Sequence, residues 1–279
     1  MPNYPIDYLT EEEATVPSPE VLYHYSSWPG VFSILSNKTL RMRHSGYLND
    51  KHEMLEGISL IQHVLETTAA SGNEKWGPHW ARVREDWLKD FSDTNVFLAS
   101  FCEKGDTLDL WRAYVKDGGA AIGFSSKHLR KSADERALWL LPCLYQRSIR
   151  SERIFEIVDY FTHNYWRPWE GDVEQFSDAV CGDLLLEIPR QKSEHFLSEN
   201  EWRLFVFGNT IDQGETVKFS VSSRGIVPHL DFAFTPEMIV ELVTDPYATP
   251  EAILGLEEFL GRSGFEHVAV RRSEVPLRP

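Results

Sequence analysis

The chain is poor in cysteine, with three among 279 residues, and those three are far apart: Cys102, Cys143 and Cys181. An odd number of separated cysteines indicates neither a disulfide framework nor a zinc site. We therefore expect ordinary thiols, as in a reducing cytosol.

Long apolar runs are also lacking. No window approaches the roughly 20 apolar residues that a membrane-spanning helix needs. Residues 1–7 carry neither the basic nor the apolar segment that begins an export signal. These absences predict a cytoplasmic protein with no membrane partner.

Positive charge is scarce, since 28 Lys and Arg stand against 43 Asp and Glu, for a net charge of −15. Such a chain has no general attraction to phosphate backbones, so non-specific binding of nucleic acid is not expected. Aromatic residues, in contrast, make up 13% of the chain and include nine Trp. That share indicates a core or a pocket built from rings.

The common catalytic motifs are missing. The sequence has no Gly-x-Ser-x-Gly elbow, phosphate loop, His-Glu-x-x-His or dinucleotide glycine fingerprint. Asp50, His52 and Glu53 lie close together, which leaves open a metal-dependent hydrolase or nuclease. A turn aspartate before a solvated helix start is the plainer interpretation, and we expect no metal.

Apolar patterning predicts a mixed α+β protein. Residues 1–20 are expected to form a flexible arm, and 21–279 a single domain with a helical insertion at about 151–190. Expected strands cover 21–25, 39–42, 95–101, 120–124, 140–146, 201–207, 216–221, 239–244 and 267–271. Helices are expected after Ser26 or Ser27, at about 54–65, 76–87 and 108–115, and after the Thr249-Pro250 start.

A polar centre is predicted at Glu201-Trp202-Arg203, at the head of an apolar run. Because a strand alternates its faces, Glu201 and Arg203 should project to one side and Trp202 into the opposite layer. The pair is either a structural ion pair or part of a site.

A second polar and aromatic strand carries His24 on the face opposite Tyr23 and Tyr25. The His24 ring has two possible roles: it is satisfied by a backbone partner, or it bonds a ligand hydroxyl. In the second case Tyr25 or Tyr47 would supply a stacking wall.

The helical segment 109–114 is also rich in candidate residues. Trp111 should face the core, whereas Arg112 lies about 100° away on the helix. Arg112 is therefore either a surface charge or a guanidinium aimed at a phosphate or a carboxylate.

Several short motifs occur in order along the chain: Leu22-Tyr23-His24-Tyr25, Tyr47-Leu48-Asn49-Asp50, Ser100-Phe101-Cys102-Glu103, Leu110-Trp111-Arg112-Ala113-Tyr114 with Gly119 and Ile122-Gly123-Phe124, Glu201-Trp202-Arg203 and Ser273-Glu274-Val275-Pro276. Through this ordered set, from about residue 21 to residue 278, the chain resembles the bacterial domain-of-unknown-function family 2971.

The opening His24-Tyr25-Ser26, the helix that ends in Ile34-Leu35, and Thr39-Leu40 are also similar to the first block of ADP-ribosyltransferase-like proteins. That similarity implies a mainly antiparallel sheet and NAD as the substrate. The departures are a second block reduced to Ser100, a long spacing from His24 to Glu201, and Arg203 beside the carboxylate.

By this resemblance, Glu201 would be the catalytic carboxylate that contacts the nicotinamide ribose, and His24 would hold a ribose. A fixed carboxylate suits the positive charge that builds on the ribose during cleavage. The other residues expected at the nucleotide are Tyr25, Ser26, Tyr47, Asn49, Ser100, Trp111, Arg112, Tyr114 and Arg203.

The sequence thus predicts an NAD-using enzyme that transfers ADP-ribose to an acceptor or hydrolyses NAD. The alternative is a non-catalytic module of a bacterial defence or stress system that senses a nucleotide or binds a partner protein. In that alternative, Glu201 and Arg203 should form a closed ion pair.

Overall fold

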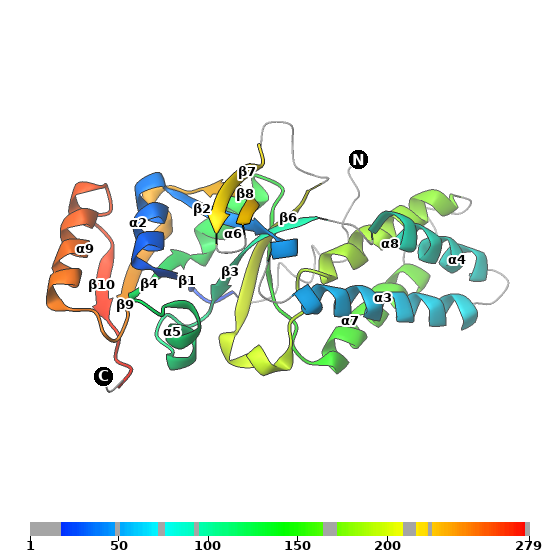
Figure 1. Ribbon diagram of the computed structural model, residues 1–279. Helices are drawn as coiled ribbons and strands as arrows, with labels where there is room; N and C mark the ends of the chain where they lie inside the picture. Colours follow the sequence, from blue (N-terminus) through cyan, green and yellow to red (C-terminus); the bar gives the residue numbers. More distant parts are fainter. Residues whose placement is uncertain are drawn as a thin grey trace.

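The computed structural model describes residues 18–47, 51–71, 76–91, 95–163, 172–208, 216–222 and 225–276. Within these residues, ten strands form one open sheet with helices on both faces (Figure 1). The strand pairings are antiparallel except that of β9 with β10. The predicted mixed α+β class with a mainly antiparallel sheet is confirmed.

Strands and helices occur throughout the described part of the chain. The strands are β1 (Val21–Ser27), β2 (Thr39–His44), β3 (Val96–Cys102), β4 (Gly119–Ser125), β5 (Trp139–Pro142), β6 (Glu201–Phe207), β7 (Lys218–Ser222), β8 (Gly225–Ala233), β9 (Ile239–Thr244) and β10 (Ala269–Arg272). The helices are α2 (Trp28–Asn37), α3 (Lys51–Ser71), α4 (Gly77–Asp86), α5 (Leu108–Tyr114), α6 (Ser126–Asp134), α7 (Arg147–His163), α8 (Val173–Glu187) and α9 (Pro250–Arg262). Shorter helical segments are η1 (Ser45–Tyr47), η2 (Trp87–Phe91), η4 (Glu194–Glu199) and η5 (Pro236–Met238).

The sheet divides at β3. Strand β6 pairs along one whole edge of β3, so β1 and β2 share the other edge. Strand β1 joins that edge at Cys102, whereas β2 joins it at Leu98 and Phe97. Between these points the two strands diverge, which separates a β1–β4–β9–β10 wing from a β2–β8–β7 wing (Figure 1).

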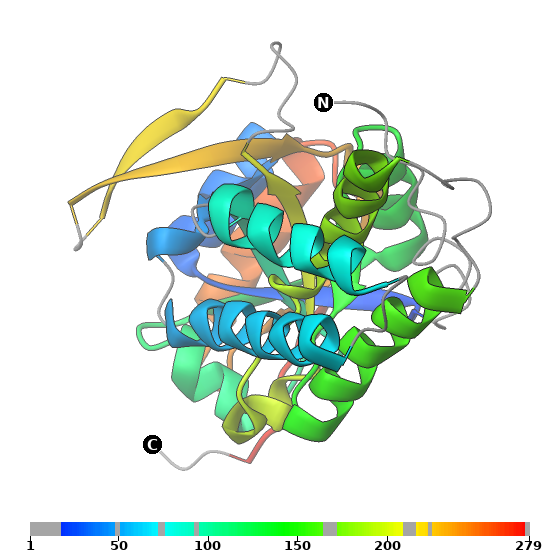
Figure 2. The same cartoon turned by 90° about the vertical axis from the view of Figure 1, so that its right-hand side faces the viewer.

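Three apolar clusters hold the layers together. One face of the sheet packs against α2, α6 and α9 through side chains such as Leu35, Leu129 and Leu260. The opposite face is covered by two groups of helices. The helices α3, α4, α7 and α8 pack over the outer half of β3 and β6 (Figure 2), and α5 packs under β1 and β4.

One strand and one α-helix lie where no element was predicted. Strand β8 contains Pro228, which cannot donate to a ladder and argues against a strand in sequence analysis. Helix α6 has few apolar residues, and only Leu129 and Ala133 among them are buried. Strand β5 also ends at Pro142, earlier than the predicted residue 146.

The expected arm lies largely outside the described residues, which begin at residue 18. Helices α7 and α8 occupy most of the stretch in which a helical insertion was expected. Among the described helices, none combines the length and apolar character required to cross a membrane.

Candidate functional site

The first residues of β6 include an ion pair, and their side chains alternate between the two faces of the strand as predicted. Arg203 donates from Nε to Oε1 of Glu201 at 2.8 Å, on one face of the strand. Trp202 packs on the other face, in the cluster beneath α2, α6 and α9. Because all seven residues of β6 are buried, the pair lies inside the protein and not on its surface.

Lys192 joins this pair to a second carboxylate. Its ammonium donates to Oε2 of Glu201 and, at 2.5 Å, to Oε2 of Glu199. Asn200 separates the two glutamates in the left-handed conformation, with φ 40°, which asparagine tolerates better than most residues. That turn links the end of η4 to β6, and it lets both carboxylates reach one lysine.

The four charged side chains, Lys192, Glu199, Glu201 and Arg203, are named here the β6 network, and each is less than a tenth exposed. Burial raises the pKa of Glu201, but the charges of Arg203 and Lys192 outweigh it and lower that pKa from 4.5 to about 2. Burial lowers the pKa of Lys192, whereas Glu201 and Glu199 raise it above its ordinary value. Both partners are therefore charged at neutral pH.

Neutral groups surround the β6 network. Tyr114 donates to both oxygens of Glu199 at 3.1 Å, and the Glu201 backbone N–H donates to the Tyr145 hydroxyl at 2.6 Å. Cys102 lies directly opposite Glu201 on β3. Burial, reinforced by Glu201 and Glu199, raises the pKa of the Cys102 thiol, so it stays protonated.

The β6 network approaches the surface at two aromatic rings. Tyr114, at the end of α5, is 43% exposed, and Phe196 in η4 is 39% exposed. The Phe196 ring lies 5.2 Å from the Lys192 ammonium. Tyr114 and Phe196 therefore connect the buried β6 network with the surface.

Ser100 occupies the point at which the sheet divides. It is the only partly exposed residue of β3, whose other six residues are buried. Ser100 pairs with Arg203 across β3 and β6, and Cys102 pairs with Glu201, so all four side chains share one face. The structure thus brings together four predicted residues: Ser100, Glu201 and Arg203 share this face, and Tyr114 joins them through its hydrogen bonds to Glu199.

His24 lies on the other face. Its Nδ1 donates to the Ser100 carbonyl at 2.9 Å, and its ring meets Phe101 edge-on at 6.0 Å. Burial lowers the pKa of His24, the Ser100 carbonyl acts in the opposite direction, and Arg43 adds to the lowering. The backbone partner weighed in sequence analysis is present, and the side chains of His24 and Glu201 leave the sheet on opposite faces.

Tyr25 and Trp111 lie on the Glu201 side of the sheet, in the cluster beneath α5. Their rings meet edge-on at 4.7 Å. The Tyr25 hydroxyl donates to the Lys104 carbonyl, and the Trp111 indole donates to Asp106. Both rings are buried, so they pack between α5 and the sheet and do not offer an exposed face on which a ligand could stack.

The remaining predicted residues are not members of the β6 network. Arg112 is exposed on α5, and Ser26 is partly exposed near the end of β1. Tyr47 lies in η1 against His44, with ring centroids 5.7 Å apart. Asn49 lies outside the described residues.

Lys192 and Glu199 were not predicted from the sequence. Glu199 had a local signal, since it stands two residues before Glu201. Lys192 had none, because its contact spans nine residues across a turn and η4. No spacing rule for helices or strands predicts such a pair.

The metal hypothesis finds no support in the described part of the chain, where no three potential ligand residues gather. Asp50 lies outside the described residues, and the side chains of His52 and Glu53 are not described.

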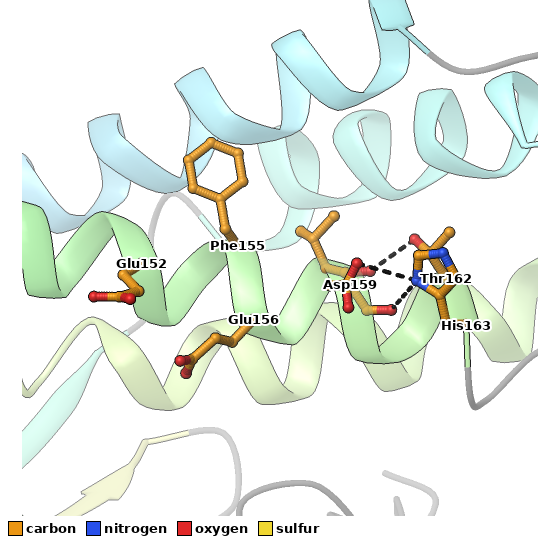
Figure 3. A pocket seen from close by; sticks show the side chains of 7 residues that line it. Glu152, Phe155, Glu156, Asp159, Thr162 and His163 are labelled. Carbon is orange, nitrogen blue, oxygen red and sulfur yellow. Dashed lines mark hydrogen bonds and ion pairs between the residues drawn. The ribbon is translucent and has the colours of Figure 1, made fainter.

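A surface pocket lies along α7 (Figure 3). It is lined by Glu152, Phe155, Glu156, Val158, Asp159, Thr162 and His163. His163 is paired with Asp159 from its own helix at 3.0 Å. The lining includes no predicted site residue.

Comparison with known proteins gives one match. Residues 110–204 match the family described as "Protein of unknown function (DUF2971)", which confirms the predicted resemblance over that segment. No curated protein and no solved structure matches the chain.

Proposed function

We propose that this chain is an NAD-using, ADP-ribosyltransferase-like enzyme that transfers ADP-ribose to an acceptor or hydrolyses NAD. One observation supports the proposal most: β1, β3 and β6, which carry His24, Ser100 and Glu201, are neighbours in that order. Ser100 and Glu201 also share a face, at the point where the sheet divides.

The charge of Glu201 suits this chemistry. When the bond between nicotinamide and ribose breaks, nicotinamide leaves with the bonding electrons and positive charge builds on the ribose. A preorganised carboxylate in a site that excludes water stabilises that charge. With a pKa of about 2, Glu201 is ionised throughout the physiological range.

The surrounding residues take roles that follow from their contacts. Arg203 fixes the Glu201 carboxylate from within the sheet. Lys192 covers its other oxygen, so its ammonium must move aside when the ribose arrives. His24 becomes a positioning residue, because it holds the free edge of β3 through the Ser100 carbonyl.

Nicotinamide release from NAD tests the proposal. Wild-type protein should release nicotinamide, and Glu201→Gln should lose about a hundredfold or more of that rate while still binding NAD in calorimetry. Glu258→Gln, at an exposed glutamate of α9, is the matched control and should retain the rate. Wild-type protein that neither binds nor consumes NAD would contradict the proposal.

A second candidate is a non-catalytic binding module. It is favoured because both carboxylate oxygens of Glu201 already accept hydrogen bonds, from Arg203 and Lys192. The Glu201 residue is also only 3% exposed. On this alternative, changes in the β6 network lower stability, and wild-type protein leaves NAD intact.

A further inference from the structure

A row of basic side chains crosses the β2–β8–β7 wing of the sheet. Arg43 on β2 lies opposite His229 on β8, and His229 lies opposite Lys218 on β7. Directly opposite residues point to the same face, with Cβ atoms roughly 5 Å apart. Arg41, opposite Asp231, lies two residues along on the same face.

The arginines of this row are available to a ligand. Arg41 and Arg43 are exposed, and neither forms an ion pair with a residue in the described ranges. The carboxylate in the row is already engaged, because Lys218 donates to Oδ2 of Asp231 at 2.9 Å. Two guanidinium groups without an ion pair in the described ranges thus stand on neighbouring positions of one face, in a chain of net charge −15.

His229 supplies a second, independent sign of a ligand. It is 4% exposed, and its Nδ1 has no partner that meets full hydrogen-bond geometry within the described chain, although the lowering of the ring pKa by burial is opposed by a weaker contact with the Val227 backbone. Its Nε2 lies 3.6 Å from Oδ1 of Asp231, beyond hydrogen-bond distance. Buried polar atoms are normally satisfied, so an acceptor next to Arg43 would complete this side chain.

The chemistry of the row indicates the class of ligand. Guanidinium groups present forks of donors that match phosphate oxygens, and an imidazole N–H adds a further donor. Burial lowers the pKa of His229, Asp231 opposes the shift, and Arg41 reinforces it. The row therefore offers several donors to an anion.

The row and the β6 network share one face. Along β3, Arg43 is opposite Leu98 and Glu201 is opposite Cys102. Leu98 and Cys102 are four residues apart along β3, roughly 13 Å, with Ser100 midway, and β2 and β6 lie on opposite edges of β3, roughly 10 Å apart. Because one methylene joins the nicotinamide ribose to the pyrophosphate, a dinucleotide meets both groups only if the Arg43 side chain extends along this face towards Ser100.

We propose that Arg43, Arg41 and His229 bind the pyrophosphate group of a dinucleotide whose nicotinamide ribose lies at Glu201. The ligand's identity rests on the proposed function, but the anion site rests on the row itself. This assigns to β2 the phosphate contact that sequence analysis expected of Arg112.

Calorimetry with ADP-ribose and with inorganic pyrophosphate tests the site directly, because neither probe needs turnover. Arg43→Met should weaken the binding of both at least tenfold. Arg262→Met, at an exposed arginine of α9, should bind as wild type does. Because Arg43 is exposed, the variant should keep the wild-type melting temperature, which confirms that it folds.

The outcomes separate this inference from the proposed function. Weaker probe binding in Arg43→Met, together with wild-type protein that leaves NAD intact, supports the anion site and contradicts the enzyme. Nicotinamide release with an unchanged KM in Arg43→Met overturns the anion site and leaves the enzyme. Wild-type protein that binds neither probe also overturns the anion site.

Discussion

Replacing Lys192 by methionine is expected to lower the free energy of unfolding by about 3–5 kcal/mol. The substitution leaves Glu199 and Glu201 buried with Arg203 as the remaining cation of the β6 network. An uncompensated buried charge is costly because it has lost its hydration without gaining a partner. Denaturant unfolding at pH 7, with the midpoint and slope compared between variants, measures the loss.

The matched control is Lys131→Met, which removes a lysine paired with Glu135 on the surface. Exposed pairs contribute about 1 kcal/mol or less. The double variant Lys192→Met/Glu199→Gln should be less destabilised than the sum of the two single variants, because one unpaired charge is removed. A loss below about 1 kcal/mol in Lys192→Met would show that the β6 network is not a buried ionic unit.

Acid should remove a stabilising contribution of Glu201. Its pKa is lowered from 4.5 to about 2 in the folded protein, so folding favours the ionised form. A carboxyl group with a depressed pKa stabilises the fold above its unfolded pKa, and that contribution is lost as the pH falls from 4.5 towards about 2. The shift corresponds to about 3 kcal/mol at neutral pH.

Unfolding free energies of wild type and Glu201→Gln, measured from pH 7 down to about pH 2, test this prediction. The difference between the two proteins should shrink as the pH falls through this window. Glu241→Gln is a useful comparison. The hydrogen bond from Arg271 is the largest cause of the lowered pKa of Glu241, and that pair is more exposed than Glu201 and Arg203. Parallel curves for wild type and Glu201→Gln would contradict the assignment.

Local patterns predicted the parts of the fold that depend on neighbouring residues. The alternation at Glu201 and Arg203 followed from strand geometry, and the cap of α9 by Thr249 followed from the Thr-Pro start. Strand β8 was missed because Pro228 opposes a strand locally, whereas pairing with β2 and β7 overrides it.

The candidate site was less predictable because it depends on contacts between distant segments. Lys192 reaches Glu201 only after the chain turns through η4. The basic row aligns because Arg43 and His229, far apart in sequence, are paired by the register of β2 and β8. His24 was assigned to the Glu201 site by resemblance, but Tyr23 lies opposite Cys102, so the alternation along β1 places the His24 side chain on the face away from Glu201.

The structure of Glu201→Gln with bound NAD tests the central claim most directly. We predict that the nicotinamide ribose lies within about 3 Å of the side chain at position 201, with Lys192 displaced. The dinucleotide should pass over Ser100, and its pyrophosphate should contact Arg43. NAD bound away from β6, or crystals that stay empty at saturating NAD with the β6 network closed, would contradict the account.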